Sequence, residues 1–471
     1  MFCTFSASAF ANGRRAVRLA AVTLVSGLVA AGVLAGAGTA AAETNTQSQG
    51  GQSQGGATAT IGGLKTYGTA VIHDDSGDLE VSAGLFEMSV EGGGTLQTYC
   101  VDLYNPTQRD ATYHEAPWSG TSLGANQDAG KIRWILQNSY PQVNDLAALA
   151  AKAGVSGLTE QDAAAGTQVA IWRYSDGADV DAADPQAEKL ADYLHDSARD
   201  LAEPAASLTL GPAAVSGLPG GLLGPVTVRT NAGTVTVAPP ADAAKSGVRI
   251  VGKNGMDVTS ARDGSELYFD VPEETAPGSA ELTVQASTTV PVGRAFTSES
   301  RSQTQILAGS SESTVSAKAT ATWADAGPIP ALSAAKNCAE GGVDITAANS
   351  GDEPFTFELM GTEHTIEAGA SDTVTIPLAE DQPYDFTITD PTGRAQRFTG
   401  ILDCLTQAAE TETGDSTQLL TAPSPATVGG ASDTNLAETG GTSITPVIAG
   451  VAIGLVVIGG AVLLLLQRRD A

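Results

Sequence analysis

The chain has 471 residues, of which 42% are hydrophobic, so it is long enough for two to four domains with separate cores. Its formal net charge is −29, with 24 Lys and Arg against 53 Asp and Glu. An acidic surface repels nucleic-acid phosphates, and we therefore expect no nucleic-acid partner.

The first residues carry the pattern of an export signal. Basic residues at Arg14, Arg15 and Arg18 precede an apolar run over 20–37, and small residues end at Ala42. This order predicts a secretory signal peptide over 1–42. Residues 43–58 are mainly Gln, Ser, Gly and Thr without an apolar period, so we expect a flexible leader.

Residues 59–203 are predicted to form an α+β domain. Short apolar and polar runs between 70 and 101 indicate strands, the last of which ends at Cys100. The apolar period then changes and predicts helices at 126–140, 145–153, 159–174 and from 184 onward. Thr159 with Asp162 resembles a capping box, and Asp184 before Pro185 is an N-cap signal.

Two all-β domains should follow. Short strands separated by Gly, Pro and Asn at 207–326, and again at 333–405, predict two immunoglobulin-like sandwiches. Cys338 precedes the first strand of the second block and Cys404 follows its last, so these cysteines can pair. Such a disulfide would stabilise the domain by about 2 to 4 kcal/mol.

The C-terminal part reads as a stalk and an anchor. Residues 406–435 are mostly Thr, Ser, Ala and Pro, which indicates a low-complexity stalk. Residues 446–466 are apolar and long enough to cross a bilayer as a transmembrane helix, and 467–471 form a basic cytoplasmic tail with Arg468 and Arg469.

A pentapeptide stands just before this apolar span: Leu436, Ala437, Glu438, Thr439 and Gly440. With the span and the basic tail it resembles a cell-wall sorting signal of the LAxTG type. The resemblance implies a class E sortase of a high-GC Gram-positive bacterium, which cuts after Thr439 and joins it to peptidoglycan. The membrane would then be only a transient or residual anchor. The alternative is a single-pass membrane protein with a chance LAETG.

The four cysteines raise a question about Cys100. Cys3 lies in the predicted signal peptide, and Cys338 can pair with Cys404. Cys100 is then left over in an oxidising compartment, where a thiol needs an explanation.

Gln168 raises a second question. It shares a helix face with Ala164, Ala165, Ile171 and Trp172, so a carboxamide projects from an apolar stripe. Burying it without partners would cost about 1 to 3 kcal/mol. A hydrogen bond to a strand end, or local exposure of that face, would explain it without special chemistry.

Both residues lie in motifs. Tyr99-Cys100, followed at long range by Thr167-Gln168-Val169-Ala170-Ile171-Trp172, resembles the thioester (TQxA) domain of Gram-positive surface adhesins over about residues 60–200. The resemblance implies an internal thioester between Cys100 and Gln168, made without a cofactor. It implies that Tyr99, Thr167, Ala170, Ile171 and Trp172 surround the bond, and the large apolar side chains would exclude water.

The resemblance further implies a wall-anchored covalent adhesin at the cell surface rather than an enzyme with turnover. An amine of a partner, such as a lysine side chain, would attack the Gln168 carbonyl once and release the Cys100 thiol. One alternative is a structural surface protein whose thioester serves rigidity. Another is a secreted cysteine hydrolase, for which the four histidines of the chain supply no recognisable motif.

Two details stay open at this point. Asp102, Tyr104 and His114 are near Cys100 in sequence and are candidates for moving its proton, although each has an ordinary explanation as a turn or strand residue. The acidic series Asp176, Asp179, Asp181 and Asp184 lacks the spacing of an EF-hand loop, and we expect no metal.

Overall fold

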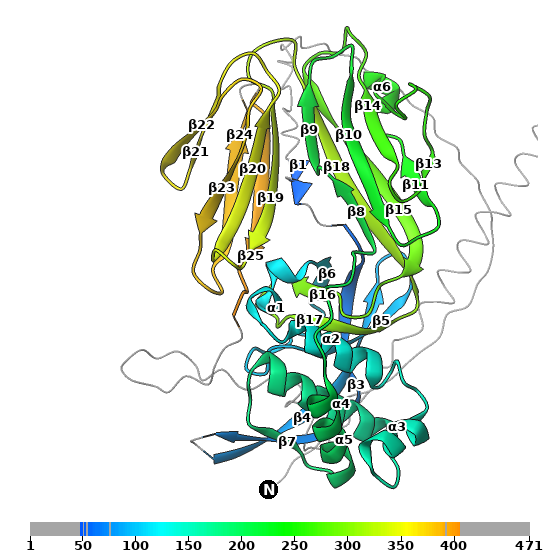
Figure 1. The fold of residues 1–471 in the computed structure, drawn as a ribbon. Helices are drawn as coiled ribbons and strands as arrows, with labels where there is room; N and C mark the ends of the chain where they lie inside the picture. The colour runs from blue at the N-terminus through cyan, green and yellow to red at the C-terminus, as the bar shows by residue number, and fades with distance from the viewer. Residues whose placement is uncertain (1–47, 50, 53–54, 75–76, 391–392, 406–471) are drawn as a thin grey trace, which may run out of the picture. The chain divides into compact units, whose positions relative to one another are not determined.

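The computed structural model describes residues 48–49, 51–52, 55–74, 77–390 and 393–405 (Figure 1). The predicted signal peptide, stalk, LAETG motif, transmembrane helix and basic tail lie outside these residues. Within the described part of the chain, no helix has the length and apolarity needed to cross a membrane. The described part consists mostly of β-strands, with a small group of helices (Figure 1).

Six strands pair in a closed ring. Their order is β4-β5-β17-β16-β6-β3, and β3 also pairs with β4, while β7 (Val180–Ala182) adds to β3 outside the ring. The six are β3 (Thr58–Asp74), β4 (Gly77–Val90), β5 (Thr95–Cys100), β6 (Thr112–Ala116), β16 (Ala295–Ser298) and β17 (Gln305–Ser310). A closed ring leaves no edge strand within it, so its backbone polar groups are paired all round.

Strands β16 and β17 belong to the ring, although their residues fall inside the range 207–326 that the sequence assigns to the first sandwich. β16 pairs with β6, and β17 pairs with β5. Phe296, Ile306 and Leu307 are fully buried there. Without this hairpin, β5 and β6 would each expose a row of unpaired N–H and C=O groups, which explains why a distant segment completes the ring.

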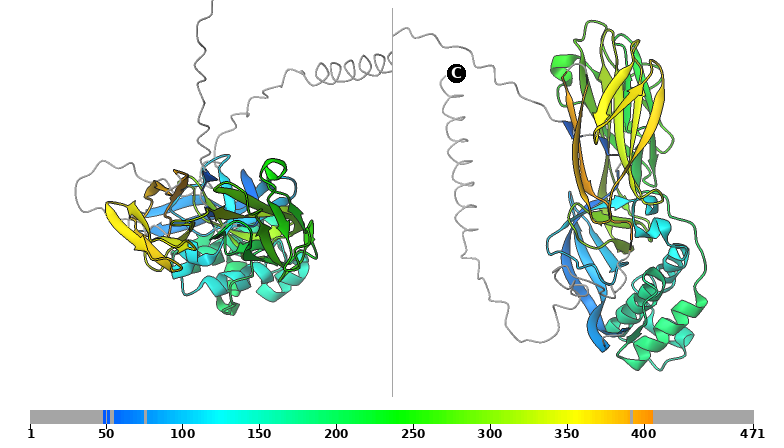
Figure 2. Two further views of the ribbon diagram at one scale, coloured as in Figure 1. Left: turned by 90° about the horizontal axis from the view of Figure 1, so that it is seen from above. Right: turned by 90° about the vertical axis from the view of Figure 1, so that its left-hand side faces the viewer.

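The helices form a layer beside these strands, which the right-hand view of Figure 2 separates from the sheet. They are η1 (Trp118–Gly120), α1 (Ser122–Ala125), α2 (Ala129–Asn138), α3 (Leu146–Ala153), α4 (Glu160–Ser175) and α5 (Pro185–Ser197). Thr159 and Asp162 form the capping box that opens α4, and Asp184 caps α5 by accepting from two backbone N–H groups.

Helix α4 is the buried centre of this layer. Residues 163–172 are all buried, because α4 contacts β3 and β4 on one side and α5 and α2 on others. A helix that is apolar all round belongs in a core. Gly166 permits the close approach of α5, since a Cβ there would meet the Ala187 carbonyl oxygen at 2.4 Å.

The first sandwich has two sheets, ordered β12-β14-β10-β8 and β13-β11-β15-β18-β9. The strands are β8 (Leu208–Gly211), β9 (Ala214–Gly217), β10 (Leu222–Thr230), β11 (Val235–Ala238), β12 (Arg249–Val251), β13 (Ser260–Ala261), β14 (Glu266–Asp270), β15 (Gly278–Thr289) and β18 (Glu312–Trp323), with a short helix α6 (Ala243–Ser246). β15 and β18 pair along their whole length, so the hairpin β16–β17 is the connection between them.

A buried ion pair holds this connection to the ring. Arg294 Nε donates to Glu115 on β6 at 2.9 Å, and Arg294 Nη1 donates to Glu203 at 2.6 Å. The Glu115 side chain is fully buried and also accepts from the Ser207 backbone at 2.9 Å. The start of the sandwich, the ring and the inserted hairpin therefore meet at one carboxylate.

The second sandwich contains β19 (Pro330–Asn337), β20 (Gly342–Asn349), β21 (Phe355–Leu359), β22 (Thr362–Ile366), β23 (Ser371–Pro377), β24 (Pro383–Thr389) and β25 (Ala395–Ile401). Two short strands of the predicted flexible leader add to it: β1 (Ser48–Gln49) pairs with β25, and β2 (Gly51–Gln52) pairs with β19. These four leader residues are extended rather than coil, because sheet edges offer backbone partners to any extended segment.

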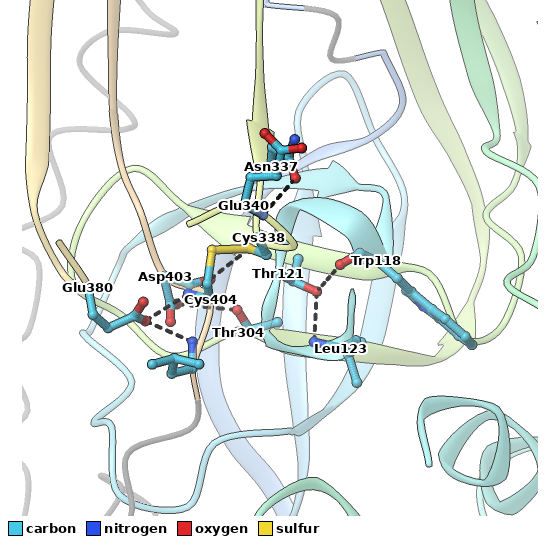
Figure 3. Close-up of a disulfide and its surroundings, with 11 residues drawn as sticks. Trp118, Thr121, Leu123, Thr304, Asn337, Cys338, Glu340, Glu380, Asp403 and Cys404 are labelled. Carbon is cyan, nitrogen blue, oxygen red and sulfur yellow. Dashed lines mark hydrogen bonds between the residues drawn. A yellow bond between two sulfur atoms is a disulfide. The ribbon is translucent and has the colours of Figure 1, made fainter. Parts of the chain in front are cut away.

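Cys338 and Cys404 form a disulfide across a sequence separation of 66 residues (Figure 3). Figure 3 shows Glu380 beside it, and this carboxylate accepts from the backbone N–H groups of Cys404 and Leu405 at 2.7 and 2.8 Å. The bond therefore closes the second sandwich at the point where the described chain ends.

Replacing both residues, Cys338→Ala with Cys404→Ala, should destabilise the second sandwich by about 2 to 4 kcal/mol, because the unfolded chain gains loop entropy. Hydrogen exchange of the β19–β25 amides measures this. Protection should fall there and stay unchanged in β3–β6. Equal protection of β19–β25 in the variant and the parent would contradict the prediction.

Candidate functional site at Cys100 and Gln168

The structure brings the two predicted site residues into contact across 68 positions of sequence. Cys100 is the last residue of β5, and Gln168 lies in the middle of α4. Both residues are fully buried. The contact exists because α4 packs against the sheet that contains β5.

Two hydrogen bonds define this contact. The Cys100 backbone N–H donates to Gln168 Oε1 at 3.0 Å, and Gln168 Nε2 donates to the Cys100 carbonyl at 2.9 Å. A backbone N–H can only donate and a carbonyl can only accept, so these partners fix which end of the carboxamide is oxygen. The carbonyl of Gln168 is thereby polarised by the residue that carries the thiol.

The carboxamide continues a strand ladder. A strand residue directs its N–H and C=O to the same side and exchanges both with one neighbour. The pairing of β4 with β5 ends at Thr98, opposite Phe86. Gln168 supplies the donor and acceptor that β4 no longer offers to Cys100. Both polar atoms of the buried carboxamide therefore have a hydrogen-bond partner, as the simpler sequence interpretation required, and burial alone does not demand a covalent bond.

The sulfur has a partner from a distant strand. Gln305 on β17 stands directly opposite Cys100 in the strand register, and its Nε2 donates to Cys100 Sγ at 3.4 Å. Thr98 donates from its hydroxyl to Gln305 Oε1 at 3.0 Å. The sequence interpretation missed Gln305, because a single glutamine in a β-rich range carries no signal until the strand pairing is known.

The other motif residues belong to the two elements that carry this pair, β5 and α4, and all are buried. Ala170, Ile171 and Trp172 are fully buried on α4. Tyr99 is fully buried and donates to the Tyr140 carbonyl at 2.9 Å, and burial raises the pKa of Tyr99 well above its usual range. The remaining member is Thr167, which donates to the Ala163 carbonyl within the helix at 2.7 Å. These five side chains are therefore out of contact with bulk water.

The three proton-transfer candidates lie in different surroundings. Asp102 is buried, and its Oδ1 accepts from the backbones of Tyr104 and Asn105 at 3.3 and 3.2 Å, which makes it a turn residue. Its Oδ2 has no hydrogen-bond partner among the described residues. The ring nitrogens of His114 contact Thr58 and Glu299 at 3.1 and 2.9 Å. Burial, with the carboxylates of Asp176 and Asp74, raises the pKa of Tyr104. Of the three candidates, Asp102 is the one with a buried oxygen that has no partner among the described residues.

Burial raises the pKa of Asp102 to about 8, and the nearby carboxylates of Asp176 and Asp403 add to the shift. Burial likewise raises the pKa of Asp176 to about 7. Carboxyl groups with such values hold a proton near neutral pH.

The acidic series contains residues with structural partners. Asp176 accepts from the Leu103 backbone at 2.9 Å, Asp181 pairs with Arg173 at 3.0 Å, and Asp184 caps α5. Among the residues that the structure describes, one other group of carboxylates lies close enough together to share an ion. It consists of Glu380, Asp381 and Asp403, near the disulfide. Such clusters are common without an ion, so no metal role follows.

Asp102 should make stability depend on pH. Its folded pKa of about 8 exceeds the value of about 4 in an unfolded chain, so between these values the folded state holds a proton that unfolding releases. Stability should therefore fall as pH rises from about 4 to 8. Asp102→Asn should flatten the pH dependence of the thermal midpoint, leaving the smaller contributions of Asp176 and Asp403, whose pKa values burial raises to about 7 and about 6. Identical pH curves for variant and parent would contradict this.

Comparison with known proteins places this site within a recognised family region. Residues 97–200 match the family model described as a thioester domain, and this range contains both Cys100 and Gln168. No protein with a curated description matches the chain.

Similar solved structures include the Bacillus anthracis TIE protein, at 16% identity and a TM-score of 0.26 over 74% of this chain and 64% of that one. The thioester domain of the Enterococcus faecium TIE86 protein has 16% identity and a TM-score of 0.27, over 57% of this chain and 97% of its own. This chain thus covers less than two thirds of the B. anthracis protein. The family match supports the assignment of this chain as a thioester-domain protein.

Proposed function

We propose that Cys100 and Gln168 form an internal thioester and that the chain is a wall-anchored surface protein which reacts once with an amine on a partner. The single observation that supports this best is the pair of hydrogen bonds between the Gln168 carboxamide and the backbone of Cys100. The pair fixes the carbonyl of one residue against the residue that carries the nucleophile.

Bond formation would use groups already in place. The Cys100 sulfur attacks the Gln168 Cδ, and the Cys100 N–H stabilises the negative charge that develops on Oε1, as an oxyanion-hole donor does. The S–C bond forms, the C–N bond breaks, and the thiol proton leaves with the nitrogen as ammonia. Proximity of the two groups replaces a bimolecular step by an intramolecular one.

The reaction with a partner takes place at the same acyl carbon, and the sulfur is now the leaving group. An amine attacks the Gln168 Cδ, an amide N–C bond forms, the S–C bond breaks, and a proton from the amine ends on the Cys100 sulfur. Exclusion of water protects the bond until then, and both residues are fully buried. The product is a permanent link, so each molecule acts once and has no turnover.

The remaining parts of the proposal come from the sequence. The signal peptide, the stalk and Leu436–Gly440 favour export and attachment to peptidoglycan by a class E sortase, with the first domain held away from the wall. The covalent target would be an amine-bearing protein or another amine ligand at a surface.

A structural role is the second candidate, and complete burial of Gln168 favours it. A carbonyl without exposed surface is closed to a large partner unless the site opens. The thioester would then serve as an internal crosslink between α4 and β5, which stiffens the domain. The two candidates share the bond and differ in access to it.

The bond itself is tested by intact-mass measurement of the purified full chain. The parent should weigh one ammonia less than its sequence requires, and Cys100→Ala and Gln168→Ala should each show the full mass of their sequences. Gln142→Leu is a matched control, since its side chain contacts the Ala308 carbonyl on β17. It should keep the deficit. A parent of full mass would refute the proposal.

Access is tested by adding amines to the same chain. Methylamine should form an amide at Gln168, which adds the mass of one methylamine to the chain, and should release one titratable thiol at Cys100. A folded protein with exposed lysines should then form a link that survives boiling in detergent. Absence of methylamine uptake by a chain that lacks one ammonia would favour the structural role, because a sealed bond does not react even with a small amine.

A further inference from the structure

We infer that Gln305 is a third catalytic residue of the proposed thioester site, supplied by the hairpin inserted in the first sandwich. The inference deepens the proposed function and rests on it. Gln305 lies beyond residues 97–200, the range that matches the thioester domain, so the family match does not identify it.

The first support is the position of Gln305 in the sheet. Gln305 and Cys100 are direct partners in the antiparallel pairing of β17 with β5. Side chains of directly opposed residues lie on the same face of a sheet, and residues two apart on one strand share that face. Thr98, Cys100 and Gln305 therefore face the same space, and Gln305 is fully buried there.

The second support is the orientation of the amide. The Thr98 hydroxyl donates to Gln305 Oε1 at 3.0 Å, which leaves Nε2 to face the sulfur at 3.4 Å. Nε2 also lies 3.4 Å from the Thr107 hydroxyl. Thr98 and Thr107 are buried, so water does not compete for these groups. The amide is held with a donor toward the reacting atom.

The chemical consequence concerns the thiolate. An N–H that donates to sulfur favours its charged form, which is the nucleophile when the thioester forms and the leaving group when an amine opens it. An amide N–H cannot give up its proton, so Gln305 stabilises the charge without protonating the sulfur. It thus assists both directions of the acyl transfer through one contact.

Two other titratable groups near Cys100 must be separated from this effect. The Tyr113 hydroxyl contacts Ser302 at 2.6 Å, and burial raises the pKa of Tyr113, with a further contribution from the Cys100 charge. Asp102 is two residues from Cys100, and burial raises its pKa to about 8. Neither of these groups is a cation, whereas Gln305 donates to Cys100 Sγ through a neutral amide.

The test compares two replacements in the full chain. Gln305→Met keeps the length of the side chain and removes the donor, and Gln305→Glu keeps its shape and places an acceptor at the sulfur. Both should slow methylamine uptake by at least about tenfold, because a hydrogen bond to a charged group is lost. Gln142→Leu, which removes another amide bonded to β17, should react like the parent. Thermal midpoints monitor folding.

A second measurement isolates the thiol. In the Gln168→Ala background no thioester can form, and the ultraviolet absorbance of the thiolate reports the pKa of Cys100. Adding Gln305→Met should raise that pKa by about one unit. If Gln305 is only a packing residue, the pKa and the uptake rate will match the parent, and the inference is refuted.

The failure of each proposal is distinguishable. A parent chain of full mass contradicts the thioester itself, and with it the catalytic role of Gln305. A parent that lacks one ammonia, together with folded Gln305 variants that react at the parent rate, contradicts the role of Gln305 alone.

Discussion

The pairing of a glutamine side chain with one backbone residue is the constraint on which the rest of this structure depends. The Gln168 carboxamide takes the place of a strand at the end of β5, where β4 has stopped pairing. For this to happen, α4 must pass through the core at that level, buried along 163–172. The small residues at Ala163–Gly166 allow α4 to pack closely against its neighbours, and Gly166 admits α5.

The site is built from parts of the chain that are far apart. β5 supplies the thiol, α4 the carboxamide, and β17 the amide donor to sulfur. The ion pair between Arg294 and Glu115 holds the β17 hairpin to the ring, and its burial makes it costly to break. The connection between β15 and β18 of the first sandwich therefore contributes a side chain to this site.

The parts of the fold that follow local rules could be predicted from the sequence. The ends of α4 and α5 follow from the Thr159 capping box and the Asp184 cap, because each cap is a contact between near neighbours. The roles of β16 and β17 could not be predicted, since strand pairing over some 200 residues leaves no periodic signal. For the same reason, the sequence did not indicate that Gln305 lies opposite Cys100. The leader strands β1 and β2 were missed because Gln, Ser and Gly have low strand propensity, and their pairing comes from the edges they meet.

The contact between Cys100 and Gln168 was expected from a family resemblance, and the structure gives it a geometry that also has a noncovalent explanation. A hydrogen-bonded carboxamide and an acyl group bonded to sulfur occupy nearly the same space. A crystal structure of the full chain separates them most directly. The account predicts continuous electron density between Cys100 Sγ and Gln168 Cδ, with the sulfur in place of Nε2 as the third substituent of Cδ. Separate side chains with a complete carboxamide would contradict it.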